Sequence, residues 1–242
     1  MQRIHCSYHK CLTVFFSRVM HAIHPFGGYG HFESRLEEFY KQHSNFHIAS
    51  INNHALDLSA FDVSCRISRF IRDPRDLVVS GYFYHKRGAE AWCNIPGPKE
   101  ENLRAVRGCA PEAMKKGESF AECLQRLDTP QGLIAEIDFR FHHFSSMANW
   151  SLNDPRIKIF RYEEILGNER KTMIQIADHY GLNPIQKWLA GILAYKYSAK
   201  KQSQKTQHIR NPQSRQWVKH FTPEVEAYFM ERYAGLIAQY NY

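Results

Sequence analysis

The stretch VSCRISRFIRDPRDLVVSGYFYHKR, residues 63–87, constrains the fold most, because a strand pattern in it runs directly into a strong helix start. Its first nine residues alternate apolar and polar side chains and end in two apolar ones, which is typical of a buried strand. Asp73 then stands at an N-cap position, Pro74 at the first helical position and Asp76 in the first turn. We therefore predict a strand over 63–71, followed at once by a helix that ends near residue 87.

Strand and helix patterns alternate along the rest of the chain. Strands separated by helices favour a parallel sheet with helices on both faces, and ligands in such folds bind at the carboxyl ends of the strands. We predict an α/β three-layer sandwich forming one domain, 1–242, with an insertion or lid at about 88–150, where Gly, Pro and charged residues are frequent. The other predicted elements are strands over 3–7, 46–51 and 156–162, and helices over 13–22, 119–127, 130–148 and 168–180, the last ended by Gly181.

The composition limits the size and the partners of the protein. With 242 residues and 43% hydrophobic side chains, the chain can bury one substantial core. A net charge of +8 favours anionic partners such as nucleotides, phosphates, sulfated glycans or nucleic acid, without choosing among them. The six cysteines form no C-x-x-C pair and the start shows no signal-peptide pattern, which indicates reduced thiols and a cytoplasmic location. No apolar run approaches the roughly 20 residues of a membrane helix, so we expect a soluble protein with no membrane partner.

The first strand leads into a loop that carries a lysine just before a predicted helix. Unpaired amide groups at the start of that helix, from Leu12 to Phe15, would point at an anion, and Thr13 adds a hydroxyl. A Walker loop needs glycines to wrap round two phosphates, and this stretch has none, which disfavours a kinase-type loop. Taken alone, a lysine in this place is more often a solvated surface residue than a phosphate ligand.

A second candidate anion site lies at the end of the strand over 63–71. Arg72 ends this apolar run, and Ser80 lies on the helix that follows. A guanidinium gives directed, charge-assisted hydrogen bonds and a hydroxyl adds another, so the two residues could clamp a phosphate. An ion pair of Arg72 with Asp73 or Asp76 is the alternative.

Four segments, in order along the chain, resemble the motifs of the sulfotransferases that use 3′-phosphoadenosine 5′-phosphosulfate (PAPS). SYHKCLTVFF resembles their P-K-S-G-T-T-W loop, and FIRDPRDLVVSGYFYHK resembles their R-x-P-x-D-x-x-x-S motif. FRYEEIL resembles the Y-E-D-L strand end, and HIRNPQSRQWVKHFTPEVEAYF resembles the closing R-K-G-x-x-G-D-W-x-x-x-F-T segment. The chain departs from these motifs where Leu12 replaces a glycine, Val14 replaces a threonine, and Asn211 and Pro212 replace Lys and Gly.

This resemblance implies a P-loop nucleotide-kinase-like fold and transfer of a sulfuryl group from PAPS, with 3′-phosphoadenosine 5′-phosphate (PAP) as product. Lys10 would stabilise the charge that develops on the leaving phosphate, and Tyr162 would lie near the adenosine. The implied ligands of the 5′-phosphate are Thr13 and the amides of Cys11, Leu12, Thr13, Val14 and Phe15, and those of the 3′-phosphate are Arg72, Ser80 and Arg210.

The resemblance also implies a histidine base, for which His54 is the candidate. Members of the family commonly end the preceding strand with a catalytic histidine, and His54 in SINNHALD occupies a matching place before Arg72. A histidine is suited to removing a proton from a hydroxyl near neutral pH. A loop histidine bonded to Asp57 is the alternative, and some members use a glutamate. His5, expected to face the sheet, and His47, expected to be buried in mid-strand, rank lower.

Three functional hypotheses follow, and a sulfotransferase is the first of them. It would act on a hydroxyl or amine of a small-molecule or glycan acceptor, without nucleic acid. A P-loop small-molecule or nucleotide kinase is the second, and a non-catalytic nucleic-acid-binding protein is the third. We expect no metal, because neither His21 with His24 nor His142 with His143 has Cys, Asp or Glu partners at ligand spacing. Trp150, Trp188 and the aromatic residues of 139–144 are expected to line a core.

Overall fold

The computed structural model describes residues 1–198, 201 and 213–242, which form two compact units. The first unit comprises Met1–Arg72 and Trp150–Gln213, and the second comprises Asp73–Asn149 and Ser214–Tyr242. A single domain with an insertion at about 88–150 stays a prediction. Within the described residues, no helix has the length and apolar character needed to span a membrane.

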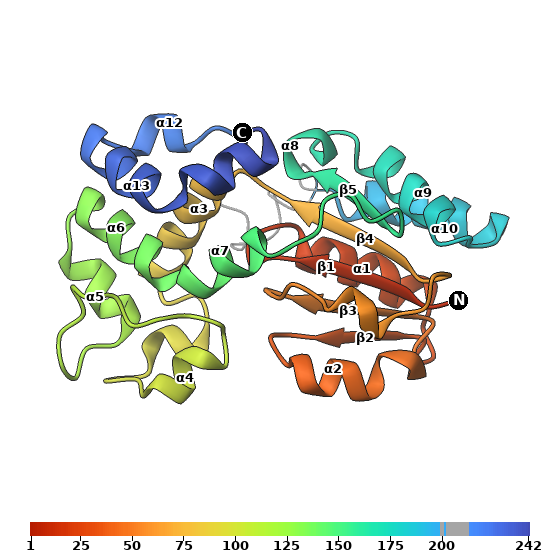
Figure 1. The fold of residues 1–242 in the computed structure, drawn as a ribbon, viewed down its shortest axis with the longest axis horizontal. Coiled ribbons are helices and arrows are strands. Elements are labelled where there is room, and N and C mark those ends of the chain that lie inside the picture. The colour runs from red at the N-terminus through yellow and green to blue at the C-terminus, as the bar shows by residue number, and fades with distance from the viewer. Residues whose placement is uncertain (199–200, 202–212) are drawn as a thin grey trace. The chain divides into compact units, whose positions relative to one another are not determined.

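The first unit is built on a parallel sheet, which in the described part of the chain has five strands in the order β2-β3-β1-β4-β5 (Figure 1). This sheet, flanked by helices, confirms the predicted fold class. Four of the strands match predicted ones, and β2 was not predicted, because it is short and contains Gly30. The strands are β1 (Arg3–Ser7), β2 (Tyr29–Phe32), β3 (Ile48–Asn52), β4 (Arg66–Ile71) and β5 (Ile157–Arg161).

The middle strands are buried on both faces, as expected of a parallel sheet covered by helices. Their polar side chains are paired inside the core. His5 Nδ1 lies 2.8 Å from Ser68 Oγ, Ser68 Oγ lies 2.6 Å from Tyr180 Oη, and Tyr180 donates to the Ile4 carbonyl at 2.7 Å. Burial, and next the charge of His31, hold the pKa of His5 well below its usual value, so His5 is a neutral structural residue.

Helices of the first unit flank this sheet, and α10 packs against both α1 and α9 (Figure 1). The predicted helix over 13–22 is α1, whose apolar face places Phe16 in the core with its ring 3.5 Å from that of His5. The helices are α1 (Thr13–Ile23), α2 (Leu36–Gln42), α8 (Tyr162–Ile165), α9 (Glu169–His179) and α10 (Pro184–Lys196), with the 3₁₀ turns η1 (His43–Asn45) and η2 (Leu58–Ala60).

The second unit is helical over its described residues, and the predicted single helix over 130–148 is in fact two. The chain bends between them at Arg140 (φ −84°, ψ 9°), whose side chain is fully buried against Glu136. The elements are α3 (Pro74–Lys86), η3 (Ala91–Asn94), α4 (Glu100–Arg104), α5 (Phe120–Arg126), α6 (Thr129–Phe139), α7 (Phe141–Ala148), α12 (Trp217–His220) and α13 (Pro223–Tyr240).

Candidate active site

The loop between β1 and α1 has a strained backbone at the two positions that matter most for the phosphate-loop prediction. Lys10 and Leu12 both have left-handed backbone angles, with φ of 72° and 58°. A non-glycine residue in this region costs on the order of 1–2 kcal/mol, so the loop must be held by its surroundings. Leu12 therefore adopts the conformation that a glycine at this position would adopt easily.

Leu12 is also the N-cap of α1, and no side chain caps this helix. The first turn contains no acidic residue, and Val14 in that turn is 62% exposed. The amides of a helix's first turn have no partner inside the helix, and the helix dipole adds partial positive charge there. The Cys11 amide differs from the others, because it donates to the Tyr8 carbonyl at 2.9 Å within the loop. Burial raises the pKa of the Cys11 thiol to about 12, which keeps this side chain neutral.

Two asparagines at the end of β3 hold this loop, and neither was predicted from the sequence. The side-chain Oδ1 of Asn53 accepts a hydrogen bond from the His9 backbone amide at 2.8 Å. The backbone amide of Asn53 donates to the Ser7 carbonyl at 2.9 Å. Asn52 Oδ1 accepts from Ser7 Oγ at 2.8 Å, and that hydroxyl lies 3.0 Å from Thr13 Oγ1. The sequence signal that could have identified them is a pair of polar residues at the end of an apolar strand. Because β1 and β3 are parallel neighbours, residues at the end of β3 lie beside the loop that follows β1.

Arg72 lies at the carboxyl end of β4 and brings two other predicted site residues together. Its Nη1 donates to the Lys10 carbonyl at 3.1 Å, and its guanidinium carbon lies 4.0 Å from the centre of the Tyr162 ring. Arg72 is only 2% exposed and Tyr162 is also buried. Residues from the ends of β4 and β5 are thus joined to the loop after β1. These segments lie close together because the strands are parallel, so their carboxyl ends lie at the same edge of the sheet.

His54 lies just beyond β3 and is 7% exposed. Its Nε2 lies 3.3 Å from the Ser34 carbonyl oxygen, and because a carbonyl only accepts, Nε2 carries a hydrogen. The lone pair of the neutral ring is then on Nδ1. The carboxylate of Asp57 accepts from the amide and the hydroxyl of Ser59. His47, by contrast, precedes β3 and is exposed, so the expectation that it is buried in mid-strand was wrong.

In the second unit, the start of α3 carries the residues of the second predicted motif. Asp73 caps the helix by accepting the Arg75 amide at 2.9 Å, and it also forms an ion pair with the Arg75 guanidinium. The buried carboxylate of Asp76 accepts the amides of Arg215 and Trp217 at 2.7 and 3.0 Å. Asp73 is thus paired with Arg75, and the predicted alternative, an ion pair of Arg72 with Asp73 or Asp76, stays a prediction. Ser80 is half-buried further along α3, and Arg210 falls outside the described residues.

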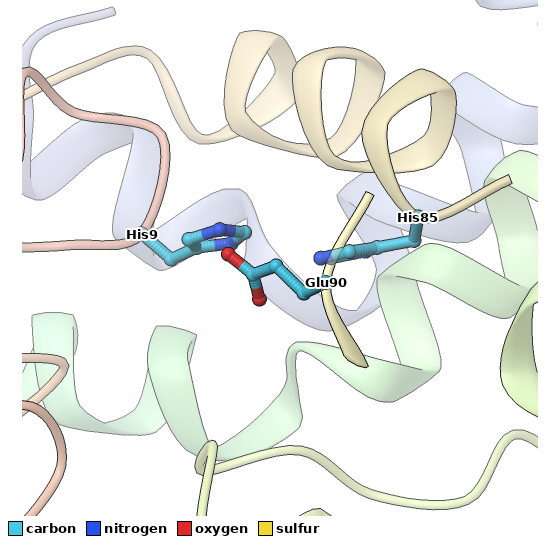
Figure 2. A group of neighbouring side chains, drawn as sticks. All are labelled: His9, His85 and Glu90. Carbon is cyan, nitrogen blue, oxygen red and sulfur yellow. The ribbon is translucent and has the colours of Figure 1, made fainter. Parts of the chain in front are cut away.

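A buried charged cluster lies further along α3. Figure 2 shows His85 at the end of this helix and Glu90 just beyond it. His85 Nδ1 lies 2.7 Å from Glu136 Oε2, and Arg140 Nε donates to Glu136 Oε1 at 2.7 Å, with all three side chains fully buried. Burial alone would raise the pKa of Glu136, but the charges of His85 and Arg140 hold this pKa below its usual value. The cluster fastens α3 to α6 and was not predicted.

Comparison with known proteins identifies the family. A family model described as "Sulfotransferase domain" matches residues 2–241. The crystal structure of mouse sulfotransferase SULT7A1 complexed with PAP is 17% identical, with a TM-score of 0.55, and the match covers 98% of this chain and 85% of that one. The structure of retinol dehydratase in complex with androsterone and inactive cofactor PAP is 14% identical, with a TM-score of 0.50, and the match covers 96% and 80%. No curated protein sequence matches significantly. The two structures support the fold, and the family model covers nearly the whole chain, which therefore belongs to the sulfotransferase domain family.

Proposed function

We propose that this protein transfers a sulfuryl group from PAPS to a hydroxyl or amine of a small-molecule or glycan acceptor. One observation carries the proposal: Arg72 donates to the Lys10 carbonyl and stacks on the Tyr162 ring. These three residues lie in three separate motifs, and the family resemblance implies that each lies at the donor. Family membership supports the reaction type.

The loop before α1 fits the 5′-phosphosulfate side of the donor. The helix start offers amides from Leu12 to Phe15, together with the Thr13 hydroxyl, and its first turn has no acid that would repel an anion. Lys10 would neutralise the negative charge that grows on the leaving phosphate. Leu12 already has the left-handed backbone that the family's glycine would provide.

Arg72 and Tyr162 fit the other end of the donor in this proposal. A guanidinium gives directed, charge-assisted bonds to phosphate oxygens, which suits the 3′-phosphate that distinguishes PAPS from ATP. Ser80 and Arg210 are assigned to the same phosphate by their place in the motifs. Tyr162 orients the guanidinium by stacking and would lie near the adenosine.

His54 is the proposed base. Bound donor supplies an electrophilic sulfur and a phosphate leaving group. As the acceptor oxygen or nitrogen forms its bond to sulfur, the bond from sulfur to the leaving phosphate oxygen breaks. The acceptor's proton then passes to His54 Nδ1, while Nε2 stays bonded to the Ser34 carbonyl and fixes the ring. Lys10 offsets the charge left on the phosphate.

Thermal melting with PAP, ATP and ADP in parallel tests the donor assignment. PAP should raise the melting temperature, because a ligand that binds only the folded state stabilises it. Arg72→Ala should weaken PAP binding by about a hundredfold, since one charge-assisted contact and its orienting role are lost. Arg66→Ala is the matched control, because Arg66 lies at the opposite end of the same strand and its guanidinium donates there to the carbonyls of residues 63–65. Stabilisation by ATP but not by PAP would overturn the proposal.

The role of His54 needs a separate measurement of binding and turnover. His54→Ala should bind PAP as the wild type does, yet transfer label to acceptor at least about a hundredfold more slowly. His47→Ala provides the control, since His47 is exposed and lies on the same stretch of chain. Wild-type turnover in His54→Ala would remove this residue from the mechanism and leave the donor site untouched.

A further inference from the structure

Helix α10 carries its largest apolar side chains on the side that faces solvent. Ile185, Trp188, Ile192 and Tyr195 are 70, 63, 42 and 61% exposed. They recur at intervals of three and four residues, which puts them on one face of the helix. We name this face the α10 stripe. Trp188 was expected in a core, and that expectation was wrong, whereas Trp150 is buried as expected.

The inward face of α10 is made of small residues. Ala190, Gly191 and Ala194 are buried, and a Cβ added at Gly191 would lie 3.2 Å from Ile174 Cδ1 on α9. Small side chains let α10 approach its neighbours closely. A surface helix normally buries its large apolar residues, whereas α10 exposes four of them and buries small ones. Contiguous exposed apolar surface of this kind marks an interaction site.

The charge around the stripe is basic. The sequence has no Asp or Glu from His179 through Pro223. Among the described residues, Lys196 and Lys201 are exposed at the end of α10, and the Lys201 ammonium lies 3.8 Å from the centre of the Tyr195 ring. Lys187 pairs with Asp178 on α9 at 2.5 Å. The rim of the stripe therefore favours an anionic partner.

We propose that the α10 stripe lies on an anionic membrane surface. Tryptophan and tyrosine prefer the boundary between headgroups and acyl chains, and lysines beside them attract acidic headgroups. A helix lying in the interface needs no run long enough to span the bilayer. The expectation of no membrane partner rested on the lack of such a run, so this proposal concerns a different mode of contact. It is independent of the proposed activity, because none of the donor residues takes part.

A second copy of this chain is a less suitable occupant. Stable protein interfaces bury roughly 800 Å² on each partner. A large aromatic side chain offers about 150–250 Å², so the exposed parts of these four residues amount to only a few hundred Å². A membrane requires no such area, because lysine attraction to acidic lipid adds to a modest apolar insertion.

Co-sedimentation of the full chain with lipid vesicles tests this proposal. Phosphatidylcholine vesicles that contain phosphatidylserine should retain the protein, and vesicles of phosphatidylcholine alone should retain much less. Trp188→Ser should weaken binding to the acidic vesicles by about tenfold. The double variant Lys196→Glu, Lys201→Glu should weaken vesicle binding further at low salt. At high salt its binding should be close to that of the wild type, because salt screens the attraction between lysines and acidic headgroups. Ile192→Ser provides a second apolar variant should Trp188→Ser fold poorly.

Phe26→Ser is the matched control, because Phe26 is an exposed apolar residue of the same unit outside the stripe. Its vesicle binding should equal that of the wild type. Equal binding by Trp188→Ser, Ile192→Ser and the wild type would overturn the proposal. A concentration-dependent dimer in light scattering, lost in Trp188→Ser, would assign the stripe to a second copy and overturn it as well. The rise in melting temperature that PAP causes should be the same in these variants as in the wild type, which checks the donor site separately.

Discussion

Two helix starts in this protein are built in opposite ways. α3 begins by the usual rules, with the carboxylate of Asp73 capping it, Pro74 in the first turn and Asp76 beside it. α1 begins after Leu12 in a left-handed conformation, with no side-chain cap and no acid in its first turn. Each is the first helix after a strand of the sheet, although the loop before α1 is longer than the one before α3.

The difference lies in which groups face the positive end of each helix. The N-terminus of a helix carries partial positive charge and unpaired amides. At α3 the protein's own carboxylates occupy this position, and Asp76 also binds two amides of the C-terminal segment. At α1 no side chain caps the helix and the first turn has no acid, so the partial positive charge there is not offset by a carboxylate of that turn. The capped start has a structural role, and we propose that the uncapped one binds the donor.

The largest predicted effect tests whether the α3 start is structural. Asp76→Ala leaves the amides of Arg215 and Trp217 without their acceptor, so the free energy of unfolding should fall by about 3 kcal/mol. Urea unfolding followed by circular dichroism measures this. Asp76→Asn should lose less, because its amide oxygen still accepts one bond. Wild-type stability in Asp76→Ala, with PAP affinity alone reduced, would make the α3 start a ligand site and remove the contrast with α1.

Local signals in the sequence predicted much of this fold correctly. The strand over 3–7 matches β1 in both bounds, and α3 begins at Pro74 behind its Asp73 cap as predicted. Short-range rules govern these elements, because capping and alternation act within a few residues. β2 escaped prediction because its four residues, which include Gly30, give too short a local pattern, and only its pairing with β3 defines it as a strand.

What the sequence could not predict depends on contacts between distant segments. Asn52 and Asn53 hold the loop after β1 through partners 45 and 44 residues away. Their place after an apolar strand marks them as candidates, but no local pattern identifies the partners. Trp188 was expected to line a core, but the sequence pattern does not determine whether its side chain points into the core or out to solvent. The roles assigned to the donor residues and to His54 stay predictions.

A carboxylate placed at the start of α1 tests the contrast more directly. Val14→Asp puts an acid in an exposed first-turn position, so helix-dipole attraction should stabilise the unliganded protein by about 0.5 kcal/mol. The same charge should repel the donor phosphate and lower PAP affinity by about tenfold. Urea unfolding and calorimetric titration give the two numbers. Val14→Asn controls for shape without charge, and unchanged PAP affinity in Val14→Asp would place the phosphate elsewhere.

The smallest predicted effect concerns the backbone of Leu12. Leu12→Gly and Leu12→Ala remove the same side-chain contacts beyond Cβ, but only glycine adopts the left-handed conformation without strain. The glycine variant should therefore be more stable than the alanine variant by about 1 kcal/mol, which parallel urea unfolding can resolve. Val14 lies in the helix, so the order should reverse there: Val14→Gly should be less stable than Val14→Ala by about 1 kcal/mol. An alanine variant as stable as the glycine variant at Leu12 would mean that the loop relaxes out of the left-handed conformation. The amides of α1 would then be arranged for an anion only when one is bound.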